Sequence, residues 1–203
     1  NVQDVARAMG MDGRIGAKFL HPGPGFGGGC FPKDLRAFAE TSRRCNTPMH
    51  LVEQTLESNE SQKQRMVAKI EQALSPLKGK TLAVLGLAYK QNTADMREAP
   101  SLALVPALAR KGARLRVFDP KAMEQAKEYF RAIEMSISYA TDEYEAIAES
   151  DALVILTEWN QFRTLNLQRI KQTLTTGWFF DFRNIYTREV IEGAGLTYCA
   201  IGQ

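Results

Sequence analysis

The sequence predicts an α/β protein, with a doubly wound parallel sheet over residues 79–203 and a helical segment over residues 1–78. The main observation is that short apolar runs alternate with helical patterns after residue 80, which is typical of parallel strands joined by helices. The second is one long helical pattern over residues 49–77, whose middle, residues 58–65, is polar. A polar centre in so long a helix favours a spine between two parts of the chain.

The N-terminal segment contains two further expected helices. Residues 1–10 form an amphipathic pattern that Gly10 and Gly13 interrupt. A second helix is expected after Pro32, ending near residues 44–46. Thr47 and Pro48 then supply a capping side chain and a first-turn proline, so they mark the start of the long helix.

The C-terminal segment contains six expected strands. They lie at residues 81–87, 115–120, 137–139, 152–156, 178–181 and 196–201, and the expected helices at 100–111, 122–132, 142–150, 167–174 and 188–192. Ligands of such sheets bind outside the carboxyl ends of the strands. The polar residues that follow strands therefore form an expected binding rim, which includes Lys90, Asp119, Thr157, Glu158 and Arg183.

The most informative stretch is residues 23–34. Five glycines within seven residues lead to Cys30 and let the backbone approach a ligand closely. Pro32 suits a first helical turn, so Cys30 is expected at a helix N-terminus, where the helix dipole and Lys33 favour a thiolate. Asp34 lies about one turn further on, so that its carboxylate is expected to face the sulfur. This combination indicates covalent catalysis on a carbonyl carbon, with a buried structural cysteine as the alternative.

Composition argues against several other classes. The net charge is +3 and the basic residues are scattered, which does not support nucleic-acid binding. Three cysteines without a CxxC pair favour a reducing compartment, so we expect a cytoplasmic protein. The two histidines lack paired ligand spacing, which argues against a metal site. No apolar run approaches transmembrane length, and a membrane is not an expected partner.

Two glycine patterns raise the question of a dinucleotide. Gly23, Gly25 and Gly28 match the spacing of a dinucleotide fingerprint, but no strand precedes them and prolines interrupt them. Gly86 after the first strand and Asp119 after the second are better placed, and they leave NAD binding on this sheet open.

A loop at residues 90–98 carries two further cations. Lys90 and Arg97 both suit phosphate. A solvated surface loop is the alternative interpretation.

Five motifs, in this order, resemble those of the UDP-glucose/GDP-mannose dehydrogenase family across the whole chain. They are Arg-Ile-Gly at 14–16, the glycine and cysteine motif at 25–34, Val-Leu-Gly-Leu-Ala-Tyr-Lys at 84–90, Asp-Met-Arg-Glu at 95–98 and Asp-Phe-Arg-Asn at 181–184. Family members are longer, so the resemblance implies that this chain corresponds to their C-terminal portion. It also implies that an N-terminal domain outside this chain binds most of the NAD.

The same resemblance implies an enzyme that oxidises the C6 alcohol of a nucleotide sugar to a carboxylate. We expect UDP-glucose as the substrate and UDP-glucuronate as the product. A GDP-mannose or UDP-aminosugar dehydrogenase is the alternative within the family, and a nucleotide-sugar-binding module without turnover is the alternative outside it. This chain by itself is expected to bind but not to oxidise.

The resemblance also assigns residues. It implies that Cys30 attacks an intermediate aldehyde and that Asp34 helps to activate the water that cleaves the resulting thioester. Lys33 and Arg97 match cofactor-binding positions, and Arg14 matches an arginine that acts in the neighbouring subunit of a homodimer. The matched substrate-binding residues are Phe19, His21, Pro22, Gly23, Pro24, Gly25, Phe26, Gly27, Tyr89, Lys90 and Arg183.

Two positions depart from the family pattern. Gly29 stands where a serine is usual, and Tyr89 stands where a phenylalanine is usual. Neither change removes a reacting group.

Overall fold

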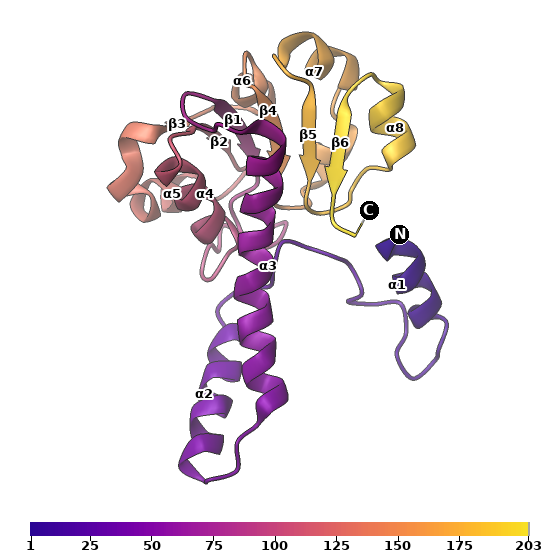
Figure 1. The fold of residues 1–203 in the computed structure, drawn as a ribbon, viewed down its shortest axis with the longest axis vertical. Coiled ribbons are helices and arrows are strands. Elements are labelled where there is room, and N and C mark those ends of the chain that lie inside the picture. The colour runs from indigo at the N-terminus through magenta and orange to yellow at the C-terminus, as the bar shows by residue number, and fades with distance from the viewer. Residues whose placement is uncertain (203) are drawn as a thin grey trace.

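A computed structural model describes residues 1–202 and confirms the predicted fold class (Figure 1). The strands are β1 (Thr81–Leu85), β2 (Arg114–Phe118), β3 (Ile137–Tyr139), β4 (Ala152–Ile155), β5 (Trp178–Asp181) and β6 (Thr197–Ala200). They form one sheet in the order β3-β2-β1-β4-β5-β6, and every neighbouring pair is parallel. The strand order reverses between β1 and β4, which is where open α/β sheets bind ligands.

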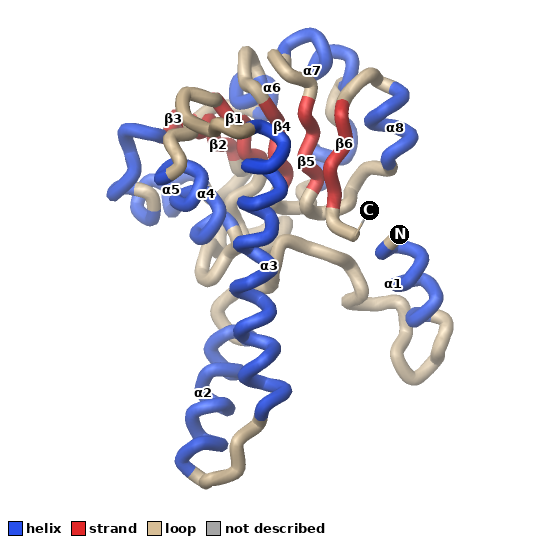
Figure 2. Tube along the Cα trace, viewed as in Figure 1, coloured by secondary structure: helices blue, strands red, loops and turns tan. Residues whose placement is uncertain are grey.

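Helices cover both faces of the sheet (Figure 2). The helices are α1 (Val2–Gly10), α2 (Phe31–Arg44), α3 (His50–Leu74), α4 (Ser101–Arg110), α5 (Met123–Tyr129), α6 (Glu143–Ile147), α7 (Leu167–Thr173) and α8 (Arg188–Gly193), with short 3-10 helices η1 (Arg131–Ser136) and η2 (Asn160–Thr164), and those that pack on the sheet are α3 to α8. Apolar residues of α3, α4 and α5 form the core on one face, and those of α6, α7 and α8 form the core on the other.

The central strand β1 shows why helices cover both faces of this sheet. Leu82 and Val84 point into the first core cluster, and Ala83 and Leu85 point into the second. All four are fully buried. Side chains alternate between the faces of a strand, so an uninterrupted apolar strand needs helices on both sides, as parallel sheets have.

The long helix α3 runs from the sheet to the far end of the molecule, where α2 packs beside it (Figure 1). Met66, Ile70 and Leu74 near its C-terminus are buried in the first core cluster. The prediction that the helix continues to residue 77 is wrong, because it ends at Leu74. Pro76 has no amide hydrogen to donate and disfavours helical geometry in the residue before it.

The N-terminal helix α1 lies apart from both core clusters and has no buried residue. Its backbone meets the end of the chain through a hydrogen bond from the Val2 amide to the Gly202 carbonyl, at 3.1 Å. None of the helices within residues 1–202 is long and apolar enough to cross a membrane.

Candidate functional site

Cys30 occupies the position that the sequence predicts, directly before the first residue of α2. The amide of Asp34 donates to the Cys30 carbonyl at 2.9 Å, which closes the first turn, and Pro32 is buried within that turn. The thiol makes no capping hydrogen bond and is exposed. The ammonium of Lys33 lies 3.2 Å from a carboxylate oxygen of Asp34. The thiol is therefore open to an incoming electrophile, with a cation and a carboxylate in the same helical turn.

The glycine-rich loop before Cys30 is fixed on one side by the polar middle of α3. The Asn59 side chain accepts a hydrogen bond from the Phe26 amide at 2.8 Å and donates one to the Phe26 carbonyl at 3.2 Å. Gln62 donates to the Gly23 carbonyl at 3.2 Å. The sequence does not predict this role for Asn59 and Gln62, because a polar middle in α3 is interpreted there only as part of a spine between two parts of the chain.

The other side of the glycine-rich loop packs on the chain that follows β1. The Gly28 amide donates to the Arg97 carbonyl at 2.8 Å. A Cβ placed on Gly27 would lie 2.5 Å from the Glu98 carbonyl oxygen, and one placed on Gly28 would lie 3.0 Å from the Tyr89 ring. Gly28 also has a φ of +93°, which glycine adopts without strain. Gly27 and Gly28 therefore allow the loop to pack closely on the segment that follows β1. This is a second role for these glycines, besides the close approach of the backbone to a ligand.

Arg97 lies across the loop next to the thiol. Asp95 accepts from its Nε at 3.0 Å and from its Nη2 at 2.7 Å. This pairing holds the pKa of Asp95 below its ordinary value and raises the pKa of Arg97. A Cβ on Gly29 would lie 2.4 Å from Cζ of Arg97. The glycine that departs from the family pattern thus leaves room for the guanidinium beside Cys30.

The predicted rim brings Arg183 to the loop and places Lys90 beside Tyr89. Arg183 forms an ion pair with Glu158, and both side chains are largely buried. Its Nη1 would lie 2.8 Å from a Cβ on Gly23, so the guanidinium meets the start of the glycine-rich loop. Lys90 is exposed, with its ammonium 5.3 Å from the centre of the Tyr89 ring. Within residues 1–202 it has no carboxylate partner, which leaves it available to an anionic ligand.

The carboxylate of Asp119 accepts hydrogen bonds from groups of the rim. It is fully buried and accepts five hydrogen bonds of 2.7–3.1 Å. The donors are the amides of Leu87, Ala88, Lys121 and Ala122 and the indole of Trp159. A nucleotide ribose would have to displace these donors, so the hydrogen bonds of Asp119 do not favour the open alternative of NAD binding on this sheet.

Gly86 does not provide a phosphate loop either. A Cβ on Gly86 would lie 2.5 Å from Cβ of Thr157, and its φ is +90°. The hydroxyl of Thr157 donates to the Ala88 carbonyl at 2.6 Å. Gly86 therefore allows the ends of β1 and β4 to pack together, and the alternative of NAD binding on this sheet loses its support.

A second buried carboxylate orders the segment that carries Arg183. Asp181 accepts hydrogen bonds from the Arg183 amide at 3.1 Å, the Tyr186 amide at 2.9 Å and the Tyr198 hydroxyl at 3.1 Å. Burial raises the pKa of Asp181. The turn that presents Arg183 is thus fixed from below by a side chain that does not itself reach the surface.

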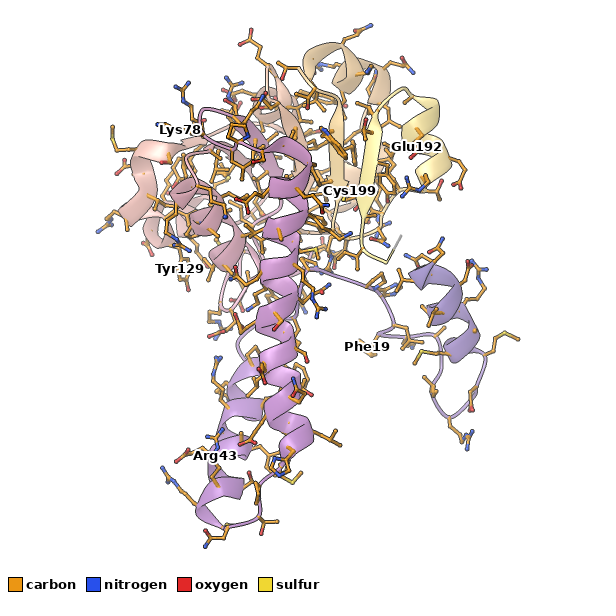
Figure 3. All side chains as sticks on the ribbon, viewed as in Figure 1. Phe19, Arg43, Lys78, Tyr129, Glu192 and Cys199 are labelled. Carbon is orange, nitrogen blue, oxygen red and sulfur yellow. The ribbon has the colours of Figure 1, made fainter. Side chains whose placement is uncertain are left out.

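Some predicted site residues lie away from this cluster. Arg14 is exposed and pairs with Asp12, whose oxygens accept from its Nε at 3.0 Å and its Nη2 at 2.6 Å. Phe19 is 96% exposed on the segment between α1 and the glycine-rich loop (Figure 3). His21 is exposed as well, whereas Pro24 is buried. No group of three or more histidine, cysteine or acidic side chains within residues 1–202 is arranged to hold a metal ion.

Fold and site together define a nucleotide-binding α/β protein in which the sheet rim meets a loop that carries a thiol. Residues 83–188 match the UDP binding domain of the UDP-glucose/GDP-mannose dehydrogenase family, and residues 1–61 match the central domain of the same family. The chain therefore belongs to the UDP-glucose/GDP-mannose dehydrogenase family.

Individual relatives agree with this assignment. A UDP-glucose 6-dehydrogenase from Rhizobium meliloti (strain 1021) is 48% identical over all of this chain and 46% of that protein. The UDP-glucose 6-dehydrogenase TuaD from Bacillus subtilis (strain 168) is 38% identical over all of this chain and 43% of that protein. The solved structure of a UDP-glucose dehydrogenase from Pyrobaculum islandicum is 32% identical, with a TM-score of 0.81 over 96% of this chain and 43% of that one. The chain thus spans less than half the length of these relatives.

Proposed function

We propose that this chain supplies the reactive thiol and the nucleotide-binding rim of an NAD-dependent enzyme that oxidises UDP-glucose to UDP-glucuronate. The observation that carries the proposal is the position of Cys30, which is exposed at the start of α2. It ends a loop that is fixed between α3 and the rim. The family assignment and the 48% identity to a UDP-glucose 6-dehydrogenase favour this substrate over GDP-mannose or a UDP-aminosugar.

The proposed chemistry uses Cys30 as the nucleophile. Its sulfur adds to the carbonyl carbon of a C6 aldehyde and forms the C–S bond of a thiohemiacetal. The π bond of the carbonyl breaks, and its oxygen takes up a proton from water in exchange for the proton that the thiol gives up. Oxidation of this adduct gives a thioester. Asp34, in the same helical turn, orients a water molecule that adds to the thioester carbonyl, and cleavage of the C–S bond restores the thiol and releases the carboxylate.

Oxidation of an alcohol to a carboxylate releases two hydrides, and two molecules of NAD⁺, bound in turn, would each accept one of them. Arg97 and Lys33 are the residues of this chain that would hold NAD⁺, because both are cations next to Cys30. We assign its other contacts to a part of the protein outside these 203 residues, because Gly86 and Asp119 are occupied by contacts within the sheet.

Isothermal titration calorimetry on this chain tests the nucleotide site. We expect UDP and UDP-glucose to bind more tightly than GDP, and NAD⁺ not to bind measurably. Lys90→Ala should weaken UDP binding by at least about tenfold, because a charge-assisted contact to phosphate is lost. No oxidation is expected from the chain alone, since orientation of the hydride acceptor supplies much of such a rate enhancement.

Lys78→Ala is the matched control for that titration. Lys78 is exposed at the far end of the sheet, between α3 and β1, and its replacement should leave UDP affinity unchanged (Figure 3). Tight NAD⁺ binding without any response to UDP would contradict the proposed nucleotide site.

We further propose a homodimer formed through the helical segment, with Arg14 acting in the site of the second copy. Val5, Met9, Ile15 and Phe19 are all exposed large apolar residues near α1, and a second copy would cover them. Light scattering should give the mass of a dimer at high micromolar concentration. A monomer at every concentration tested would argue against dimerisation of this chain.

A further inference from the structure

The polar middle of α3 faces inward. Asn59 is only 8% exposed and Lys63 only 4%, whereas Gln64 beside them is exposed. Asn59, Gln62 and Lys63 follow a spacing of three and four residues, which places them on one face of the helix. All three contact the glycine-rich loop. This face is therefore a binding surface for the loop within the same chain.

Asn59 makes the most specific of these contacts. One amide side chain pairs with both backbone groups of Phe26, accepting at 2.8 Å and donating at 3.2 Å. The two bonds fix the peptide orientation on either side of a residue that lies four positions before Cys30. A Cβ on Gly25 would lie only 2.9 Å from the Asn59 side-chain oxygen, so the loop passes directly over this amide.

Among the polar side chains of this face, only Asn59 uses a donor and an acceptor on one loop residue. Gln62 supplies a single donor to Gly23. Lys63 packs its aliphatic stem against Gly25, and its ammonium pairs with Glu60 at 2.7 Å. Loss of the Asn59 amide would therefore release the middle of the loop while α3 itself stayed intact.

We propose that Asn59 is a positioning residue for the Cys30 thiol, an inference that rests on the proposed function in so far as it concerns turnover. Its amide sets the path of the loop between Gly25 and Cys30, and so sets where the sulfur meets the reacting carbon. A displacement of about 1 Å in such a group can reduce a rate by about 10²-fold. The effect should appear in the rate of the chemical step and only weakly in nucleotide affinity, because Lys90 and Arg183 lie on the sheet rim.

Two substitutions separate this role from helix stability. Asn59→Ala removes both hydrogen bonds, and alanine is the stronger helix former, so α3 should not be weakened. Asn59→Asp keeps the size and the acceptor but replaces the donor to the Phe26 carbonyl by a carboxylate oxygen. Gln64→Ala, on the exposed face of the same helix, is the matched control.

The first measurement is alkylation by iodoacetamide of the 203-residue chain, followed by peptide mass spectrometry. Cys45 is exposed at the other end of α2 and serves as the internal reference. In both Asn59 variants we expect the ratio of the Cys30 rate to the Cys45 rate to fall by about threefold or more, as the released loop changes the orientation of the sulfur relative to the neighbouring cations Lys33 and Arg97. The ratio in Gln64→Ala should equal that of the unmodified chain. An unchanged ratio in both Asn59 variants would overturn the proposal.

The second measurement is steady-state oxidation of UDP-glucose by the complete protein. We expect kcat to fall about 10²-fold in Asn59→Ala, with UDP affinity within about fivefold of the unmodified protein. A kcat equal to that of Gln64→Ala would also overturn the proposal. If the unmodified protein oxidises no nucleotide sugar, the proposed function fails, and the alkylation ratio still decides the role of Asn59.

Discussion

Replacement of Cys30 by serine is expected to abolish formation of UDP-glucuronate by the complete protein, with a loss of at least about 10³-fold at neutral pH. A thiol is already a few per cent ionised near pH 7, whereas a serine hydroxyl without an adjacent base is not. In this structure the residue has no base of its own, since the neighbouring Lys33 and Asp34 pair with each other. Serine would therefore retain the shape of the site but lose the nucleophile.

Product analysis by liquid chromatography and mass spectrometry checks this expectation. Cys45→Ser is the control, because Cys45 is exposed at the opposite end of α2, and it should retain full activity. Slow release of an aldehyde by the Cys30→Ser protein, or sugar held on the serine, would agree with the proposed mechanism. Near-normal production of the carboxylate would refute a nucleophilic role for Cys30.

The sheet could be predicted because its central strands β1 and β4 are apolar on both faces and the other strands are short apolar runs between helical patterns. All six strands lie where the sequence places them, with ends that differ by a few residues. β1 and β2 each end two residues earlier than expected, β1 at Leu85 and not at Leu87, and β2 at Phe118 and not at Pro120. Gly86 turns the chain away with a φ of +90°, and the amides of Leu87 and Ala88 donate to Asp119 in place of a neighbouring strand.

The position of the thiol was also predictable, because glycine, cysteine and proline are close together in the sequence and report on local geometry. The anchors of the loop were not, since Asn59 lies 33 residues from Phe26. A polar stretch in a helix can face water, or it can form hydrogen bonds with another segment of the chain. The sequence does not distinguish these two cases, and the fold does.

Trp159 illustrates a residue with two roles. Its side chain packs in the second core cluster and is 5% exposed. Its indole also donates to Asp119 at 3.1 Å. The sequence contains no signal for this bond, because β2 and β4 are brought together only through β1.

Replacement of Asp119 by alanine should have the largest effect on folding of the substitutions considered, lowering the free energy of unfolding by about 4 kcal/mol. Five donors lose their acceptor at a fully buried position, and each unsatisfied buried donor costs about 1–3 kcal/mol when water cannot replace the carboxylate. Urea unfolding followed by circular dichroism measures the change. Asp142→Ala is the control, because Asp142 also accepts from a backbone amide, that of Glu145, but at an exposed helix start. Its loss should cost about 1 kcal/mol.

Replacement of Asp119 by asparagine tests whether stability depends on the two acceptor oxygens of the side chain or on the volume that it fills. Asparagine has the same size, but one of its two polar ends is an NH₂ group, which would face amides that are themselves donors. We therefore expect the asparagine variant to lose more than half of the stability that the alanine variant loses. A variant nearly as stable as the unmodified chain would mean that Asp119 acts by filling space. Because the amides of Leu87 and Ala88 precede Lys90 on the rim, both variants should also bind UDP more weakly under conditions in which they remain folded.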